Sequence, residues 1–405
     1  MRVCVGIVGA GPAGLFAANV LTRAGIDTVV VERLDESAVR ARARAGLIED
    51  RTARLLDRHG LAAGMQQRGK TLGVCEFRRD GHGYVYDYGS LCGARHRIYP
   101  QQLLVADLID ALRGAGGEIR FVTPATAIHV RDRPVIELVD GHSLVCDIVL
   151  GCDGFHGVSR TAVSDLGHCG VDFGAEWLAI LAEAPPSSRH QLYGLHPELY
   201  GLHPDGFAGH MHRTATVSRF YLQVPPGTRP DLDDEDIWAA LDTRLAAQGQ
   251  PLTHGPIIEK AILQLRSAVT QPLQCGPLYL AGDAAHIVTP AGGKGMNLAL
   301  QDAAELVEGV TRFVHQGDRD RLDGYSTTRL PRIWQAVEFS HQMLQLLLAR
   351  DPGTPRGEFH EGLRSAQLTR LMDDEVFTRA FARTYVGLDP ILTSSSQAGP
   401  RFLRT

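Results

Sequence analysis

The sequence has no long apolar run and no excess of one charge. Its 405 residues include 41 basic and 46 acidic side chains, a formal net charge of −5, with no extended block of either sign. Basic tracts that bind nucleic acid or an anionic membrane surface are therefore missing. No apolar window reaches the length of a membrane span, and the apolar stretch 3–8 is too short for a secretory signal. We expect a cytoplasmic protein that acts on small molecules and binds neither nucleic acid nor a membrane.

Cysteines are few and irregularly spaced. The seven of them form an odd number and contain no Cys-x-x-Cys pair. Such spacing indicates neither a disulfide framework nor a zinc site, so we expect reduced thiols. The rest of the composition, 44% hydrophobic and 21% charged residues, is typical of a globular protein, and the length of the chain allows two or three modules.

The N-terminal segment predicts a dinucleotide-binding unit. An apolar strand ends in Gly9-x-Gly11-x-x-Gly14 and runs directly into a helix. The first glycine permits a tight turn, the second lets backbone N–H groups approach a pyrophosphate, and the third lets helix and strand pack closely. A second apolar strand, residues 28–31, ends in Glu32, whose carboxylate can accept hydrogen bonds from ribose hydroxyls. A nucleotide fold this early in a chain is common among FAD enzymes.

Two later segments carry further candidate ligands. Residues 40–46 alternate arginine with small residues, which places Arg42 and Arg44 on one side of an extended segment. This arrangement suits phosphate, and a solvated basic loop is the alternative. Asp153 follows an expected strand in an aspartate–glycine turn, at the edge where open α/β sheets bind ligands. Capping of the next helix is a second role open to Asp153.

The segment from residue 278 has a similar organisation. A strand ends at Asp283, and an amphipathic helix begins with Gly295, Met296 and Asn297 behind further glycines. A helix N-terminus that faces a flavin ring stabilises negative charge there, which eases reduction of the flavin.

The middle of the chain loses helical periodicity and predicts β-structure. Residues 73–87 alternate apolar and polar positions around a turn at 79–81 and predict a β-hairpin. Residues 176–266 predict further strands and contain a cluster of polar rings and cations. The cluster comprises Tyr193, Tyr200, His203, His210, His212, Arg213, Arg219 and Tyr221. Because these histidines lack carboxylates at ligand spacing, we expect no metal, and recognition of an organic anion fits better.

Three separated motifs together resemble the single-component flavoprotein aromatic hydroxylases, and among them the 4-hydroxybenzoate 3-monooxygenases. The motifs are Gly9-x-Gly11-x-x-Gly14 with Glu32, Cys152-Asp153-Gly154 with Arg160, and Gly282-Asp283 with Pro290. Other matching stretches are distributed over nearly the whole chain: Glu32-Arg33, Arg42-x-Arg44-Ala-Gly46, residues 151–160, Leu265-Arg266-Ser267, residues 281–288 and Tyr385-Val-Gly-Leu388.

The resemblance implies a fold class and a division of the chain. The fold would be α/β, with a Rossmann-like (GR2-type) FAD-binding domain, an inserted β-rich substrate domain and C-terminal helices. The FAD-binding domain would comprise residues 1–72, 98–175 and 267–345. The substrate domain would comprise residues 73–97 and 176–266, and a helical cap would comprise residues 346–405.

The resemblance also implies a reaction. FAD, NADH or NADPH, and O₂ would hydroxylate 4-hydroxybenzoate, or a close para-substituted benzoate, ortho to its donor group through a flavin C4a-hydroperoxide. The ortho carbon is nucleophilic enough only when the para hydroxyl gives up its proton. Three alternatives stay open: another aromatic substrate such as 3-hydroxybenzoate, 4-aminobenzoate or a dihydroxybenzoate, a non-oxygenating FAD reductase, and an FAD protein that only binds aromatics. A homodimer is also left open.

Site residues carry over from the family position by position. The implied FAD ligands are Gly9, Gly11, Gly14, Glu32, Arg33, Arg42, Arg44, Gln101, Asp153, Arg219, Asp283, Gly295, Met296 and Asn297. The implied nicotinamide contacts are Arg33, His156, Arg160 and Arg266. In the family pattern Arg219 supports the flavin in its working position.

The implied substrate residues lie in the β-rich part and at its borders. Arg213 and Tyr221 would bind the substrate carboxylate. Tyr200 would hydrogen-bond the phenol oxygen, Tyr385 would continue that proton path, and the carbonyl of Pro290 would lie near the same oxygen.

Two positions depart from the family pattern. Met211 stands where the family has a serine beside the carboxylate-binding arginine, and Leu72 aligns with the histidine that ends the tyrosine proton path. Leucine cannot relay a proton, so the exit would need another group, for which His203, His210 and His212 are candidates.

Overall fold

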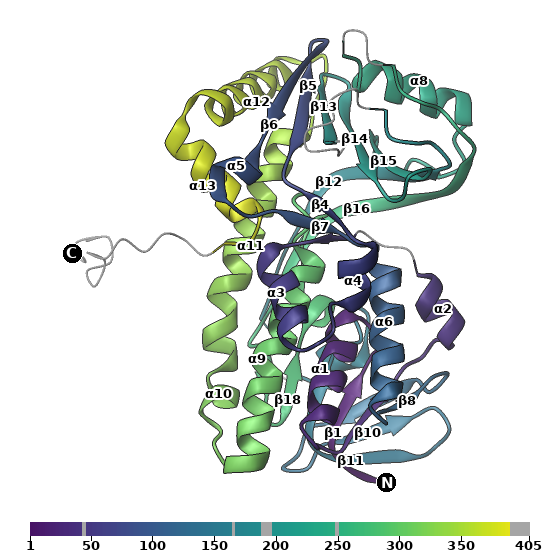
Figure 1. Cartoon of the computed structure of the whole chain (residues 1–405), viewed down its shortest axis with the longest axis vertical. Coiled ribbons are helices and arrows are strands. Elements are labelled where there is room, and N and C mark those ends of the chain that lie inside the picture. The colour runs from purple at the N-terminus through teal and green to yellow at the C-terminus, as the bar shows by residue number, and fades with distance from the viewer. Residues whose placement is uncertain (43–45, 164–166, 188–196, 248–250, 389–405) are drawn as a thin grey trace, which may run out of the picture.

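The computed structural model describes residues 1–42, 46–163, 167–187, 197–247 and 251–388 (Figure 1). The candidates Arg44 and Tyr193 lie outside these ranges. The described chain forms two stacked halves, each built on one large sheet (Figure 1). The predicted α/β fold, with its β-rich second sheet and C-terminal helices, is confirmed.

The first sheet contains the dinucleotide motif. Its strands are β1 (Arg2–Val8), β2 (Thr28–Val31), β8 (Glu118–Arg120), β9 (Ala125–His129), β10 (Val135–Leu138), β11 (Ser143–Gly151), β17 (Gln274–Cys275) and β18 (Leu278–Leu280). The order β18-β11-β1-β2-β8 is parallel throughout, while β17 and the β9–β10 pair add antiparallel strands at its margins. The parallel strands are short apolar runs because helices cover both faces of such a sheet.

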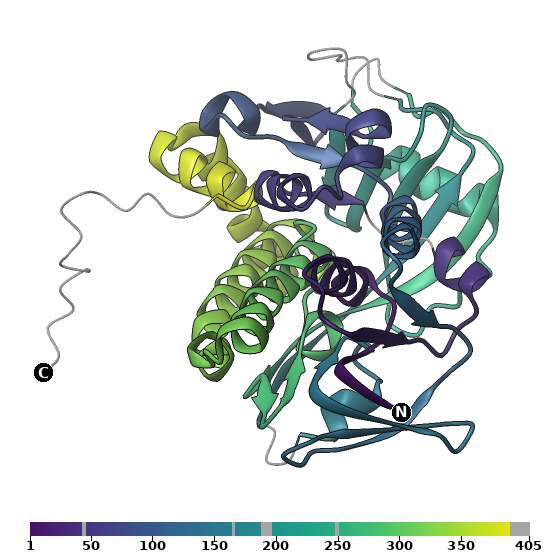
Figure 2. The same cartoon turned by 60° about the horizontal axis from the view of Figure 1, so that its bottom comes forward.

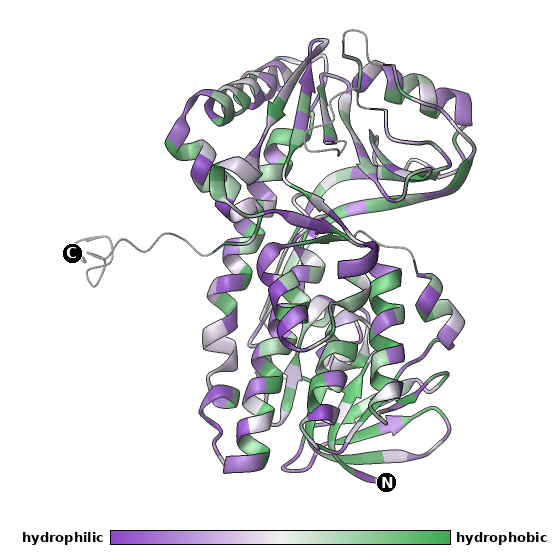
Figure 3. Ribbon diagram, viewed as in Figure 1, coloured by the Kyte–Doolittle hydropathy of each residue, from purple (hydrophilic) through white to green (hydrophobic). Residues whose placement is uncertain are grey.

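Helices of the lower half pack on this sheet. They are α1 (Pro12–Arg23), α2 (Glu36–Ala41), α3 (Asp50–Arg58), α4 (Ala63–Arg68), α6 (Gln101–Gly114), α7 (Val158–Thr161), the 3₁₀ helix η1 (Gly282–Ala284), α9 (Gly295–Gln316), α10 (Asp320–Asp323) and α11 (Tyr325–Leu347). Helix α1 packs between α6 and α9, and α11 lies along α9 (Figure 2). Their apolar side chains join the strands in one core. The strands of this half are mainly hydrophobic in Figure 3, whereas the outer helix α2 is mainly hydrophilic.

The second sheet forms the upper half. Its strands are β5 (Cys75–Arg79), β6 (His82–Tyr86), β12 (Gly167–Ala182), β13 (Glu198–His203), β14 (Gly206–His212), β15 (Ser218–Val224), β16 (Ile257–Gln271) and β19 (His286–Ile287), in the order β19-β16-β12-β15-β14-β13-β5-β6. The predicted hairpin at 73–87 is confirmed as β5–β6. Helix α8 (Asp234–Arg244) covers one face, with Leu241 and Trp238 packed against strand side chains. Since side chains alternate along a strand, the other face carries the ring-rich set that lines the candidate site.

Two predicted borders of the substrate domain fall inside long paired strands. The borders after residues 175 and 266 fall inside β12 and β16, which pair with each other from Gly167↔Gln271 to Ala182↔Ile257. Their register shifts between Asp172 and Glu176, where the partners change from Arg266 to Gln264, so both predicted borders lie at an irregularity of this pair of strands. The division into domains stays a prediction. The border after residue 345 falls near the end of α11.

The remaining elements connect the halves. A small sheet of β3 (Leu47–Ile48), β7 (His96–Ile98) and β4 (Lys70–Leu72) lies between them (Figure 1). Helices α5 (Tyr88–Cys92), α12 (Pro355–Asp373) and α13 (Glu375–Tyr385) pack beside the second sheet. None of the helices in the described ranges has both the length and the apolarity needed to cross a bilayer.

Candidate active site

The turn after β1 has the geometry that a dinucleotide requires. Gly9 adopts φ +104°, and a Cβ there would lie 2.4 Å from the carbonyl oxygen of Cys152. A Cβ at Gly14 would lie 2.1 Å from the carbonyl oxygen of Gly9, whereas a Cβ at Gly11 would meet no atom within 4 Å. Helix α1 begins at Pro12 with no side-chain cap and no acidic residue in its first turn. Its positive end is therefore accessible to a diphosphate.

Glu32 connects this turn to the end of β2. One carboxylate oxygen accepts the backbone N–H of Ala10 at 2.8 Å, and the other accepts that of Leu34 at 3.0 Å. Each carboxylate oxygen has two lone pairs, so hydrogen bonds from ribose hydroxyls can add to these contacts. The residues present therefore fit the adenosine half of a dinucleotide cofactor.

Parallel topology brings the other predicted ligands to the same edge. Gly9, Glu32, Asp153 and Asp283 each follow the carboxyl end of a strand, and those strands are neighbours in the parallel part of the first sheet. Ligands of open α/β sheets bind at this edge. The sequence identified these positions, but only the strand order makes them neighbours.

Two of the predicted cofactor ligands have structural partners. The Asp153 carboxylate accepts the backbone N–H of Ser159 at 2.9 Å, which supports its role as a helix cap, and burial raises its pKa. The Asn297 amide donates to the carbonyls of Leu47 and Gly293, both at 2.9 Å, and accepts the N–H of Glu49. Asn297 thus holds the approach to α9 in place, and both of its amide hydrogens are used in doing so.

A buried ion pair that the sequence analysis missed lies at the start of α9. The Lys294 ammonium donates to Glu49 at 2.7 Å and to the carbonyl oxygens of Thr384 and Tyr385 at 2.6 and 2.9 Å. Burial opposes the charge of Glu49, yet the Lys294 ammonium lowers its pKa, so the carboxyl stays ionised. One side chain therefore joins the α9 turn, the small sheet region and α13.

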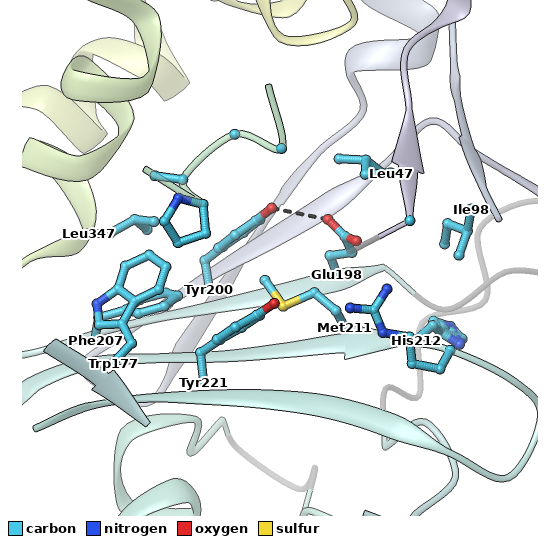
Figure 4. Close-up of a pocket in the computed structure, with 16 residues that line it drawn as sticks. Leu47, Ile98, Trp177, Glu198, Tyr200, Phe207, Met211, His212, Tyr221 and Leu347 are labelled. Carbon is cyan, nitrogen blue, oxygen red and sulfur yellow. Dashed lines mark hydrogen bonds between the residues drawn. The ribbon is translucent and has the colours of Figure 1, made fainter. Parts of the chain in front are cut away.

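A cavity opens between the second sheet and the turn before α9 (Figure 4). Its lining comprises Gly46, Leu47, Ile98, Trp177, Glu198, Tyr200, Phe207, Met211, His212, Arg213, Tyr221, Pro290, Ala291, Gly292, Gly293 and Leu347. The five predicted substrate residues, Arg213, Tyr221, Tyr200, Met211 and Pro290, are all in this set.

Strand register explains how the cavity forms. Tyr200 pairs with Gly209, and Gly209 pairs with Tyr221, so these three residues lie in one row across β13, β14 and β15. The glycine leaves space between the two tyrosines, because a Cβ there would lie 2.8 Å from the ring of Phe207. Small residues at the centre of a sheet face commonly mark the close approach of a ligand.

The cavity lining includes a cationic side chain. Arg213 follows β14, and it is the only arginine or lysine that lines the cavity among the described residues. Burial lowers its pKa, but a guanidinium stays charged in proteins. Tyr221 lies against this guanidinium. Arg219, which pairs with Met211 in the neighbouring strand, is only 5% exposed.

The cavity lining also includes part of a chain of hydroxyls. The Tyr200 and Tyr385 hydroxyls lie 2.8 Å apart, and the Tyr200 hydroxyl donates to Glu198 at 3.0 Å (Figure 4). Burial raises the pKa of both tyrosines, so they stay protonated in the ordinary pH range. The sequence analysis missed Glu198. Its position two residues before Tyr200 on a strand was the available signal, since such residues share a face.

The expected proton exit has no relay group. Leu72 is 1% exposed and packs with Val74 and Ile98. His96, which the sequence analysis did not single out, places Nε2 3.0 Å from the carbonyl oxygen of Tyr385 and Nδ1 3.0 Å from the Tyr88 hydroxyl. Burial, together with the Lys294 ammonium, lowers the pKa of His96 to about 3 and keeps it neutral.

The three histidine candidates for this exit lie in different places. His210 is buried, stacks on Phe220 at 4.5 Å and points to the α8 face, away from the cavity. His203 is partly exposed and pairs with Asp205. His212 lines the cavity near Arg213 (Figure 4).

A second cationic group lies outside the cavity. The guanidinium carbons of Arg160 and Arg266 lie 4.1 and 4.8 Å from the ring centre of Phe155. His156 approaches Arg266 at 3.4 Å. Three of the four predicted nicotinamide contacts are thus neighbours around a ring that the sequence analysis had not singled out, while Arg33 is exposed after β2.

Metal and disulfide chemistry have no counterpart in the described ranges. No three His, Cys, Asp or Glu side chains of these residues form a group that could hold a metal ion. All seven cysteines are free thiols.

Comparison with known proteins gives independent information. Residues 2–340 match the family described as FAD binding domain. The chain is 34% identical over 397 residues to the p-hydroxybenzoate hydroxylase of Acinetobacter baylyi, with 96% of each chain covered. It is 27% identical over 412 residues to a 3-amino-4-hydroxybenzoate 2-monooxygenase of Streptomyces platensis, covering 95% of this chain and 98% of that one. The structure of an anhydrotetracycline hydroxylase from Streptomyces rimosus matches with a TM-score of 0.76 at 26% identity, over 96% of this chain and 77% of that one.

Proposed function

Because this chain belongs to the family of FAD-binding aromatic hydroxylases, we propose that it hydroxylates 4-hydroxybenzoate, or a close para-substituted benzoate, ortho to the para donor. It is a flavin-dependent aromatic monooxygenase, and the proposal concerns its substrate, its electron donor and its residues. The product from 4-hydroxybenzoate would be 3,4-dihydroxybenzoate, with NADH or NADPH as the reductant.

One observation carries the choice of substrate. The cavity lining combines the guanidinium of Arg213 and Tyr221 with the hydroxyl of Tyr200, which lies 2.8 Å from that of Tyr385. A buried carboxylate needs a charged partner, and a guanidinium binds it with two parallel hydrogen bonds. A para-hydroxybenzoate carries an acid and a phenol on one ring, and the lining offers a partner for each of them.

The cofactor residues follow from the geometry of the first sheet. FAD would be held by the turn at Gly9, Gly11 and Gly14, by the carboxylate of Glu32, and by Asp283. Other proposed contacts are Arg33, Arg42, Arg44, Gln101, Arg219, Gly295 and Met296, with Asp153 and Asn297 acting through backbone. Bound flavin, once reduced, supplies the activated oxygen atom. This chain's own residues orient the ring, exclude water and move the phenolic proton.

Tyr200→Phe should separate binding from chemistry. The carboxylate anchor remains, so we expect the Kd for 4-hydroxybenzoate to change less than about threefold, while hydroxylation falls roughly 100-fold because the phenol loses its proton relay. Oxygen consumption should continue with release of hydrogen peroxide. Product and peroxide per NAD(P)H oxidised measure the coupling. Full coupling in Tyr200→Phe would contradict the assignment of Tyr200 to the phenol.

NADH should serve at least as well as NADPH. Arg33 is followed closely by Asp35 and Glu36, whose carboxylates would oppose a 2′-phosphate. Hydrogen bonds from Ser37 lower the pKa of Asp35, and those from Arg113 lower that of Glu36, so both are ionised. The ratio of kcat/KM for the two donors measures this preference, and Glu36→Gln should shift it towards NADPH. A strong preference of the native protein for NADPH would show that these charges do not face the phosphate.

A substrate panel tests the function as a whole. NADH and NADPH oxidation should be recorded with 4-hydroxybenzoate, 3-hydroxybenzoate, 4-aminobenzoate and dihydroxybenzoates, with product and peroxide identified. Hydroxylated product from 4-hydroxybenzoate at the highest kcat/KM supports the proposal. Oxidation without oxygenated product from any of them would favour a reductase or an aromatic-binding protein.

A further inference from the structure

Glu198 is a buried carboxyl group that the substrate and cofactor assignments leave without a role. It begins β13, is 5% exposed and lines the cavity. Its Oε2 accepts the hydroxyl of Tyr200 at 3.0 Å (Figure 4). Buried carboxylates are costly, so one that is kept inside a cavity lined largely by apolar side chains calls for an explanation.

The groups that face Glu198 come from five elements. They are Tyr200 on its own strand, Tyr385 on α13, Cys75 on β5, Tyr88 on α5 and Arg213 after β14. Burial raises the pKa of Glu198, and Tyr200 and Arg213 oppose that shift. The tyrosines and the thiol are protonated in the ordinary pH range because burial raises their pKa values as well. Glu198 is therefore the base among them.

The phenolic proton needs an acceptor, and few side chains near the Tyr200 hydroxyl can accept it. Leu72 has no polar side-chain atom, and His96 contacts the backbone carbonyl of Tyr385 rather than its hydroxyl. His210 points to the opposite face of the sheet. In the described part of the chain, the two hydrogen-bond partners of the Tyr200 hydroxyl are Tyr385 and Glu198.

We propose that Glu198 is the proton acceptor of the cavity and receives the substrate's phenolic proton through Tyr200. The inference rests on the proposed function. The substrate O–H bond breaks as a new O–H bond forms on the Tyr200 oxygen, and the original Tyr200 O–H bond breaks as one forms on Glu198 Oε2. No atom changes its oxidation state. The negative charge moves from Glu198 to the substrate oxygen. The reverse transfer returns the proton to the product hydroxyl.

This transfer keeps the charge inside the cavity constant. Losing the proton to solvent would leave three negative charges in the cavity, those of Glu198, the phenolate and the substrate carboxylate, with Arg213 as the only arginine or lysine on the lining in the described ranges. In a poorly solvated site such a charge is expensive. Sharing one proton between Glu198 and the phenol avoids it, and the two groups then titrate as a pair.

The experiment uses the FAD-loaded protein and measures the ionisation of bound 4-hydroxybenzoate. Ultraviolet difference absorbance gives the phenolate fraction against pH, and an indicator dye in weak buffer gives the protons released. 4-Methoxybenzoate, which has no phenolic proton, is the ligand control. The variants are Glu198→Gln, which keeps the shape but is not basic, and Glu198→Asp, which keeps the base. Glu338→Gln on the exposed side of α11 is the control variant.

The expected results differ between variants. The native complex should show a phenolate fraction that stays constant over the pH range where the pair holds one proton, with little proton release. Glu198→Gln should lose this plateau and release roughly one proton for each phenolate formed. Its hydroxylation rate should fall roughly 100-fold, while its Kd for 4-methoxybenzoate stays within about threefold. Glu198→Asp should restore the plateau in part, and Glu338→Gln should match the native protein.

Two outcomes would overturn the role of Glu198 alone. A third would overturn the proposed function as well. If the native protein binds and hydroxylates 4-hydroxybenzoate but its phenolate curve coincides with that of Glu198→Gln, Glu198 is not the acceptor. The same follows if the native complex releases one full proton per phenolate. If Glu198→Gln does not fold, the inference is still tested by the number of protons that the native complex releases per phenolate and by the phenolate curve of Glu198→Asp. If the native protein does not bind 4-hydroxybenzoate, the proposed function fails, and this inference fails with it.

Discussion

Arg213→Ala should weaken binding of 4-hydroxybenzoate by roughly 2–5 kcal/mol, the usual cost of removing one partner of a buried charge pair. This corresponds to an increase in Kd of roughly 30- to 4,000-fold. The effect is large because Arg213 is the only arginine or lysine on the described lining of the cavity, and Met211 supplies no hydroxyl beside it. Titration of the FAD-loaded protein by calorimetry or flavin absorbance measures the change.

Three controls sharpen this result. Arg213→Lys should recover part of the affinity, because it keeps the charge and loses the planar fork. Phenol, which has no carboxylate, should bind native and Arg213→Ala proteins with similar affinity. Arg229→Ala, at an exposed arginine paired with Asp231, should leave binding unchanged. An unchanged Kd for 4-hydroxybenzoate in Arg213→Ala would show that the carboxylate binds elsewhere.

Gly14→Ala and Gly11→Ala should both prevent FAD binding, for different reasons. A Cβ at Gly14 would lie 2.1 Å from the backbone oxygen of Gly9, so α1 and the turn after β1 must separate. Overpacking of this kind costs about 1–3 kcal/mol and occasionally more, so the apoprotein itself should unfold at a lower temperature. A Cβ at Gly11 meets no protein atom within 4 Å. That variant should fold normally and lose FAD affinity, because its methyl group occupies the approach to the diphosphate.

Two measurements on flavin-free protein distinguish these cases. Thermal unfolding should show a lower Tm for Gly14→Ala and a native Tm for Gly11→Ala. Quenching of FAD fluorescence during titration should then show weaker binding in Gly11→Ala. Gly362→Ala, in α12, where a Cβ would meet no atom within 4 Å, is the control for a glycine-to-alanine change away from the site. Normal flavin occupancy in Gly11→Ala would refute the placement of the diphosphate.

Much of the fold could be predicted because its signals are local. Glycine spacing, short apolar runs and alternating residues predicted the first sheet, the β5–β6 hairpin and the β-rich middle of the chain. The predicted substrate residues Tyr200, Met211, Arg213 and Tyr221 lie on adjacent strands, so their alternation limits which face they share. The sequence did not show that β12 and β16 are long strands that run through the predicted borders at 175 and 266, because their pairing joins residues far apart in the chain.

The missed residues depend on contacts between distant segments. Lys294 and Glu49 are 245 residues apart in the chain, so no local pattern joins them. His96 reaches the Tyr385 backbone across 289 residues. In a sequence, charged and polar side chains of this kind look like ordinary surface residues. Whether they are buried depends on how the whole chain packs, which the sequence alone does not show.

The sequence by itself determined the chemical class of this protein, because a dinucleotide turn depends on glycines at fixed spacing and backbone angles are set locally. It also placed Tyr200, Arg213 and Tyr221 in the β-rich segment 176–266. Only the tertiary structure decided that Tyr385 meets Tyr200 across 185 residues and that Glu198 completes their hydrogen-bonded chain. Hydrogen bonds form over about 3 Å. Such distances between side chains on β13 and α13 are fixed by the packing of the helices on the second sheet, which no local pattern encodes.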